Sequence, residues 1–122
     1  MKSLYLEENM NDARFMSLYF ATTSHSLHHV LDIKEAEEVL MHNKDFDLLL
    51  IDIMLRQGRE GFSFIQSLRK RGFRQPIVAV TSLATEQDRE TCLESGANHV
   101  LQKPFRITAL VSLIQEIDAV LK

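Results

Sequence analysis

Short apolar runs alternate with longer amphipathic segments along the whole chain. The runs with the length and composition of buried strands cover residues 3–6, 26–31, 47–52, 76–81 and 98–102. The segments with helical spacing of apolar residues cover 12–20, 34–42, 62–71, 86–95 and 107–121. Regular alternation of strands and helices is typical of a parallel sheet with helices packed on it. The pattern predicts an α/β domain built from five βα units.

Residues at the helix ends and on the helix faces support this assignment. Gly72 and Gly96 follow the third and fourth helical segments, where a left-handed cap is expected. Thr85 and Asp88 have the spacing of a capping box at the start of the fourth. Spacings of three and four residues predict core-facing stripes on the last, third and first helices, made by Ile107, Leu110, Ile114, Ile117 and Leu121, by Phe62, Ile65 and Leu68, and by Phe15, Leu18 and Tyr19.

Composition narrows the class of protein. A chain of 122 residues with 45% hydrophobic content is enough for one domain with a substantial core. The net charge of −3, with acids and bases interspersed, argues against direct nucleic-acid binding. No apolar stretch reaches the roughly 18 residues needed to span a bilayer. The single cysteine, Cys92, and the absence of a secretion-signal pattern predict a cytoplasmic protein without a membrane role.

Acidic, hydroxyl and amine side chains stand at the ends of several of the predicted strands. Glu7 and Glu8 come directly after the first strand, and Asp52 ends the third. Thr81 ends the fourth strand, and Lys103 follows the fifth. Open α/β sheets bind ligands at the carboxyl ends of their strands, so these side chains are expected to converge in one crevice.

Each of these residues also has a simpler interpretation. An aspartate after a strand often caps a turn, and acids such as Glu7 and Glu8 often favour the amino terminus of a helix. Lys103 alone would be a solvated amine, although Pro104 restrains it to an extended conformation. Thr81 is a common strand residue. Because all of these residues stand at strand ends, we favour a common polar site over these separate interpretations.

Histidines at positions 25, 28 and 29 raise the question of a transition-metal site. His28 and His29 are expected to point to opposite faces of a strand, and no cysteine or nearby carboxylate completes a tetrahedral set. They are interpreted as edge or surface residues.

The chain resembles the receiver domains of bacterial two-component response regulators. The resemblance rests on the run from Asp47 to Leu55 around Asp52, on Gly61-Phe62, on Val80-Thr81-Ser82, on Gly96-Ala97 and on Lys103-Pro104-Phe105, all in the expected order. It covers essentially residues 1–122 as a single receiver domain, with no effector domain visible. It implies a three-layer flavodoxin-like fold with strand order 2-1-3-4-5, a class for which a chemotaxis receiver is a standard example.

The resemblance also implies roles for the strand-end residues. Asp52 would be the phosphoacceptor, forming an aspartyl phosphate, with Thr81 and Lys103 as catalytic and switch residues. Mg²⁺ would be held by Glu8, Asp52 and the backbone carbonyl of Met54, with Glu7 acting through a water. A cis peptide bond is implied between Lys103 and Pro104.

The implied partners are those of a signalling module rather than of a turnover enzyme. The phosphodonor would be a histidine kinase or a histidine phosphotransfer protein. The output face would lie on the fourth helix, fifth strand and fifth helix, over 86–95, 98–102 and 107–121. This face would bind a downstream protein or a second copy of the chain.

Departures from the family pattern keep an alternative open. The acidic pair is Glu7-Glu8 where Asp-Asp or Glu-Asp is usual, and Val100 stands at the usual aromatic switch position. A pseudo-receiver that acts as a phosphorylation-independent protein-binding scaffold would carry such changes. A small metal-dependent phosphohydrolase is disfavoured, because its second acid would stand where this chain has Met54.

Overall fold

The computed structural model describes residues 1–55 and 58–121, and its strands and helices alternate along the chain. The strands are β1 (Lys2–Leu6), β2 (Ser26–Val30), β3 (Leu48–Asp52), β4 (Ile77–Thr81) and β5 (His99–Gln102). The helices are α1 (Met10–Ala21), α2 (Ile33–His42), α3 (Glu60–Lys70), α4 (Glu86–Ser95) and α5 (Ile107–Leu121). Each predicted element is present, with bounds within two residues of those expected.

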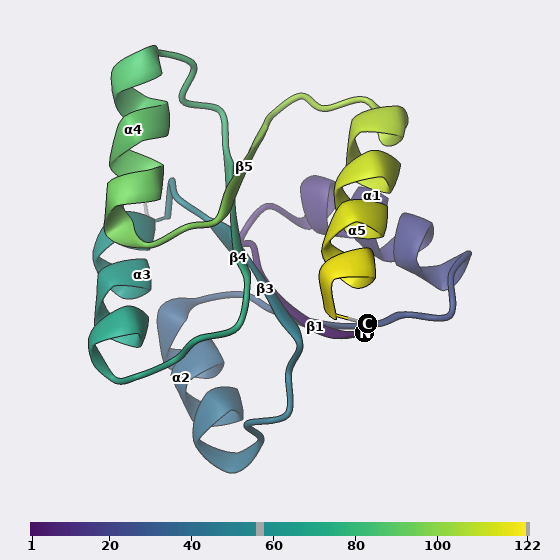
Figure 1. Cartoon of the computed structure of the whole chain (residues 1–122), viewed down its shortest axis with the longest axis horizontal. Coiled ribbons are helices and arrows are strands. Elements are labelled where there is room, and N and C mark those ends of the chain that lie inside the picture. The colour runs from purple at the N-terminus through teal and green to yellow at the C-terminus, as the bar shows by residue number, and fades with distance from the viewer. Residues whose placement is uncertain (56–57, 122) are drawn as a thin grey trace.

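The strands form one parallel sheet in the order β2-β1-β3-β4-β5. Helices α2, α3 and α4 cover one face of this sheet, and α1 and α5 cover the other (Figure 1). The predicted three-layer flavodoxin-like fold is confirmed. The strand order reverses between β1 and β3, which is where doubly wound sheets open a crevice at the carboxyl ends of their strands.

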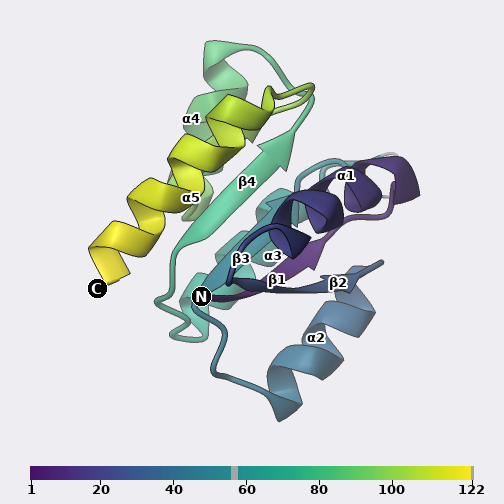
Figure 2. The ribbon, with the colours of Figure 1, turned by 90° about the vertical axis from the view of Figure 1, so that its right-hand side faces the viewer.

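Alternate residues of the central strands supply the two apolar layers. In β3, Leu49 and Ile51 pack under α2, α3 and α4, whereas Leu48 and Leu50 pack under α1 and α5. Figure 2 looks onto the second layer, where α1 and α5 lie on the side of the sheet that faces the viewer. β3 and β4 are buried along their whole length, as expected of strands covered on both faces.

The predicted helix ends are confirmed. Gly72 and Gly96 have positive φ angles of 87° and 122° after α3 and α4. At the start of α4, Asp88 N donates to Thr85 Oγ1 at 3.0 Å and Thr85 N donates to an Asp88 carboxylate oxygen, which completes the capping box.

The predicted core stripe of α1 is wrong. Phe15 and Leu18 are 42% and 64% exposed, and α1 instead buries Ala13, Met16 and Phe20. The two sets of apolar residues lie on different faces of the helix, and apolar spacing alone did not decide which face packs on the sheet. On α5 the middle of the stripe is buried, but Ile107 and Leu121 at its ends are exposed.

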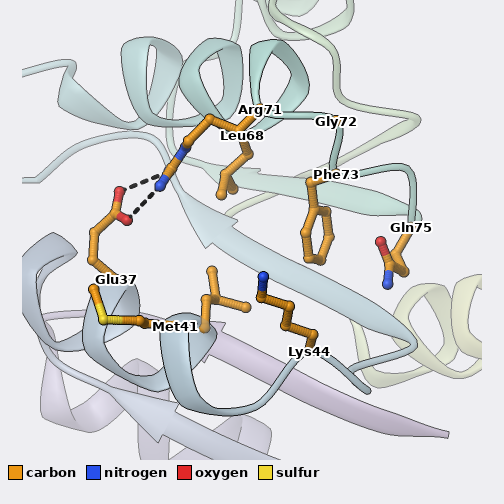
Figure 3. A pocket seen from close by; sticks show the side chains of 9 residues that line it. Glu37, Met41, Lys44, Leu68, Arg71, Gly72, Phe73 and Gln75 are labelled. Carbon is orange, nitrogen blue, oxygen red and sulfur yellow. Dashed lines mark hydrogen bonds and ion pairs between the residues drawn. The ribbon is translucent and has the colours of Figure 1, made fainter.

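A pocket lies between α2, α3 and the loops that lead into β3 and β4 (Figure 3). It has a volume of about 460 Å³, and the Glu37 carboxylate and Arg71 guanidinium pair across its rim at 2.7 and 2.8 Å. This pocket opens beside the amino ends of the strands. It therefore lies at the opposite end of the sheet from the polar strand ends.

Among the described helices, none is both long enough and apolar enough to cross a lipid bilayer.

Candidate functional site at the carboxyl ends of the strands

The polar residues predicted at the strand ends lie on adjacent strands of the sheet. Glu7 directly follows β1, and Asp52 is the last residue of β3, the strand next to it. Asp52 is in register with Val80, so Thr81 lies one residue beyond it on β4. Lys103 follows β5, and its backbone N–H donates to the Thr81 carbonyl at 2.7 Å. Parallel pairing thus gathers these residues at one edge.

Lys103 joins the carboxylates of this edge. Its Nζ donates to Glu7 Oε1 at 2.5 Å and to Asp12 Oδ2 at 2.8 Å, and it lies 3.5 Å from Asp52 Oδ2. The Lys103 side chain is 16% exposed. Burial lowers the pKa of Lys103, but hydrogen bonds to Asp12 and Glu7 outweigh that effect and the pKa is raised. Lys103 is therefore an ammonium at neutral pH.

Glu7 is fully buried, and both of its carboxylate oxygens accept hydrogen bonds. Besides the Lys103 ammonium, Oε1 accepts from the Tyr5 hydroxyl at 3.0 Å, and Oε2 accepts from the backbone N–H of Asn9 at 3.1 Å. His29 Nε2 lies 2.7 Å from the Glu7 carbonyl oxygen, and the His29 ring packs against the Tyr5 ring. Glu7 is thereby held in one orientation from several sides, whereas Glu8 next to it is exposed.

Asp52 is buried, at 4% exposure, in a site with other carboxylates. Its Oδ1 accepts from the Met54 backbone N–H at 3.1 Å. Burial raises the pKa of Asp52, and the hydrogen bond and charge of Glu7 raise it further, to about 7. Lys103 and the Met54 N–H oppose this shift without cancelling it. The negative charge on Asp52 is thus poorly compensated.

The other residues predicted to take part in switching lie on or directly after β4 and β5. Thr81 is buried, and its Oγ1 accepts from the Leu83 backbone N–H at 3.0 Å. The Lys103–Pro104 peptide bond is cis. Val100 pairs with Ala79 on β4 and packs against the apolar layer under α2, α3 and α4. An aliphatic side chain therefore stands at this position of β5, half-buried within the packed layer.

The chemistry of the site suits a hard divalent cation. Among the described residues, the ion pairs join the carboxylates of Glu7, Asp12 and Asp52 to the ammonium of Lys103, which leaves an excess of negative charge. Carboxylate and carbonyl oxygens are the ligands that Mg²⁺ prefers. Within 1–55 and 58–121 no cluster of three His, Cys, Asp or Glu side chains has metal-binding geometry. A Mg²⁺ site here would have to include a backbone carbonyl and water, as the ligand set predicted from the sequence does.

Several residues that contact the site were not predicted from the sequence. The sequence pattern predicts only that Asp12 starts a helix, that Tyr5 lies in a strand and that His29 lies at an edge or on the surface. Asp12 lies one helical turn after Asn9, whose Oδ1 caps α1 by accepting from Asp12 N at 3.0 Å. Tyr5 precedes Glu7 by two residues, and side chains two apart share a face of a strand. That spacing was the available signal for Tyr5.

A model of the response regulator receiver domain matches residues 6–115. The transcriptional regulatory protein HprR of Escherichia coli (strain K12) is 28% identical over 115 residues, which cover 94% of this chain and 50% of that protein. The regulatory protein VanR of Enterococcus faecium is 30% identical over 114 residues, or 93% of this chain and 48% of that protein. The chain thus spans about half the length of these curated relatives.

Solved structures agree with the family match. The receiver domain of the Francisella response regulator 1452 superposes with a TM-score of 0.89 at 26% identity, covering 99% of this chain and 98% of that one. The BeF3-activated N-terminal receiver domain of Klebsiella pneumoniae RstA gives a TM-score of 0.84 at 26% identity, covering 94% of this chain and 96% of that one. The chain therefore belongs to the response regulator receiver domains of two-component signalling systems.

Proposed function

We propose that this receiver domain accepts a phosphoryl group on Asp52 from a histidine kinase or a histidine phosphotransfer protein. The observation that carries the proposal is the position of the Asp52 carboxylate. It lies at the carboxyl end of a central strand, is under-neutralised by its surroundings, and has the Lys103 ammonium 3.5 Å away. If this carboxylate accepts a phosphoryl group, the Lys103 ammonium is already close enough to neutralise part of the added negative charge.

The proposed step is an in-line transfer. A carboxylate oxygen of Asp52 attacks phosphorus, and an acyl phosphate O–P bond forms as the P–N bond to the donor histidine breaks. The donor imidazole keeps the electron pair of that bond and takes up a proton. Catalysis of such a transfer consists mainly of positioning and of charge stabilisation.

Lys103 and Thr81 are the residues proposed to stabilise the product. The Lys103 ammonium neutralises charge on the transferred group, and the Thr81 hydroxyl donates to a phosphoryl oxygen. The backbone hydrogen bond from Lys103 N to the Thr81 carbonyl, at 2.7 Å, links the two strand ends. A movement of Thr81 is thereby transmitted to the segment after β5.

Mg²⁺ is the proposed cofactor. Glu8, Asp52 and the Met54 carbonyl would hold it, with Glu7 acting through a bound water. When bound, the ion neutralises the charge of the phosphoryl oxygens during transfer. The engagement of both Glu7 oxygens by Tyr5, Lys103 and Asn9 supports an indirect role for Glu7.

The proposed output is a shift between two conformations of the face formed by α4, β5 and α5. Because Val100 takes the place of an aromatic switch, the shift is proposed to pass through the backbone after Thr81 and Lys103. The active conformation would bind a downstream protein or a second copy of the chain. The protein acts as a signalling module, and its site is proposed to act in the cytoplasm.

The test is phosphorylation of the purified protein by acetyl phosphate in the presence of Mg²⁺, followed by intact mass. One added phosphoryl group is expected in the wild type, and none in Asp52→Asn or after chelation of Mg²⁺. A histidine kinase domain of a related system provides a second donor.

A negative result with both donors and an intact fold would refute the phosphoacceptor role. The alternative would then be the pseudo-receiver, a scaffold that binds its partner without phosphorylation. The departures from the family pattern at Glu8 and Val100 would then be read as a loss of switching.

A further inference from the structure

The contacts of Lys103 are unequal, and the weakest is with the proposed acceptor. The distances from Nζ are 2.5 Å to Glu7 Oε1, 2.8 Å to Asp12 Oδ2 and 3.5 Å to Asp52 Oδ2. Charge-assisted N–H···O bonds are typically about 2.7–2.9 Å long. Lys103 is therefore hydrogen-bonded to Glu7 and Asp12, while its interaction with Asp52 is a longer ion pair.

The two carboxylates of Asp12 and Asp52 differ in their exposure to solvent. The Asp12 side chain is 43% exposed, whereas the side chains of Glu7 and Asp52 are 0% and 5% exposed. Asp12 belongs to α1, and Asp52 ends β3. The ammonium thus lies between a carboxylate open to solvent and the buried acceptor.

The position of Asp12 is fixed by the start of α1. Its backbone N–H donates to the Asn9 side chain at 3.0 Å, and it lies in the first turn, where the helix dipole favours a carboxylate. Asp12 can hold Lys103 without a rearrangement of the helix. This contact joins residues 91 positions apart in the chain.

We propose that Asp12 is a positioning residue that competes with the phosphoryl group for Lys103. In the unphosphorylated protein Asp12 and Glu7 hold the ammonium, and on transfer the ammonium moves toward the phosphoryl oxygens on Asp52. Asp12 thereby restrains both the formation and the lifetime of the aspartyl phosphate. This inference rests on the proposed function of Asp52 as phosphoacceptor.

If Asp12 competes for Lys103, removing the charge of Asp12 should increase the rate of Asp52 phosphorylation. Asp12→Asn keeps the shape of the side chain and removes its charge, so Lys103 is freer to contact the phosphoryl group. A partly exposed ion pair changes an equilibrium by roughly two- to fivefold, and we expect a rate increase of that size. The lifetime of the phosphorylated form after removal of the donor should lengthen by a similar factor.

The experiment compares variants in acetyl phosphate with Mg²⁺, with initial labelling rate and lifetime read by intact mass. Asp12→Glu restores the charge and should return both values toward the wild type, which a merely structural role would not explain. Asp45→Asn is the matched control, because Asp45 pairs with Lys2 at the same distance, 2.8 Å, at the amino ends of the strands. It should leave rate and lifetime unchanged.

Circular dichroism melts verify that each variant is folded. A labelled wild type with an unchanged or slower Asp12→Asn variant would overturn the competition while leaving the phosphoacceptor role intact. An unlabelled wild type, or equal labelling of Asp52→Asn, would overturn the proposed function and this inference with it.

Discussion

The Tyr5 hydroxyl donates a hydrogen bond to Glu7 Oε1 over 3.0 Å within the buried part of the site. Burial and the neighbouring Glu7 carboxylate raise the pKa of Tyr5 above its usual range, so the phenol stays protonated and remains a donor. The same Glu7 oxygen accepts from Lys103. Tyr5 thus helps to fix the carboxylate that anchors the lysine of the site.

Replacement of Tyr5 by Phe should destabilise the fold by about 1–2 kcal/mol, because Glu7 loses a charge-assisted hydrogen bond in a buried setting. Urea denaturation monitored by circular dichroism measures this difference. Tyr19→Phe is the control, because Tyr19 is half-buried on α1 and no hydrogen bond of its hydroxyl is seen among the described residues. Equal effects of the two substitutions would contradict the role assigned to Tyr5.

Asp52 should make stability depend on pH in the absence of Mg²⁺. Its pKa is about 7 in the folded protein and about 3.9 in an unfolded chain, so the folded state binds the proton more tightly. Protonation of Asp52 therefore contributes to the free energy of unfolding. This contribution is fully present below about pH 4 and is lost as pH rises through about 7. Asp52→Asn removes this loss.

Urea midpoints measured from pH 4 to pH 8 in a chelator test the linkage. The advantage of Asp52→Asn over the wild type should grow as pH rises, and added Mg²⁺ should reduce it. Parallel curves for the two proteins across this range would show that Asp52 is not strained by burial and Glu7.

Gly61, in the first turn of α3, packs closely against the backbone at the end of β3. A Cβ at this position would lie 2.4 Å from Ile53 Cα and 2.5 Å from the Asp52 carbonyl oxygen, and both are backbone atoms. Gly61→Ala should therefore cost about 1–3 kcal/mol of stability, as overpacking of a closely packed site does, and should slow phosphorylation by displacing Asp52.

Ser63→Ala is the control for Gly61→Ala, since Ser63 is exposed on the same helix. It should change stability by less than about 0.5 kcal/mol. Chemical denaturation and the acetyl phosphate assay together distinguish a displaced site from a destabilised helix. Wild-type behaviour of Gly61→Ala in both would show that the backbone of Asp52 and Ile53 accommodates a Cβ at this position.

Substitution of Glu8 should change the affinity for Mg²⁺ and have little effect on the stability of the fold, because Glu8 is exposed beside the buried Glu7. Glu8→Gln removes the charge of the ligand proposed for Mg²⁺ and should weaken Mg²⁺ binding about tenfold or more, a loss equivalent to about 1.4 kcal/mol or more. Isothermal titration calorimetry measures the affinity.

Glu38→Gln, at an exposed position on α2, is the control for the change in net charge. It should bind Mg²⁺ as the wild type does. Unchanged affinity in Glu8→Gln would remove Glu8 from the proposed ligand set and leave the metal role to Asp52 and Glu7.

The architecture was predictable from local pattern. The alternation of apolar runs with helical spacing specified the elements, and the caps at Thr85, Gly72 and Gly96 specified helix ends, because these signals depend on neighbours within a few residues. The convergence of Glu7, Asp52, Thr81 and Lys103 was predictable because parallel strands bring their carboxyl ends to one edge.

Contacts that depend on how a helix is rotated or which rotamer a side chain adopts required the tertiary structure. Sequence spacing placed Phe15 and Leu18 in the core, but packing against the sheet selected Ala13, Met16 and Phe20 instead. The same packing of α1 brings Asp12 to Lys103, 91 residues away in sequence. A local pattern carries no information on such a contact, because it is set by how a helix packs against strands from distant parts of the chain.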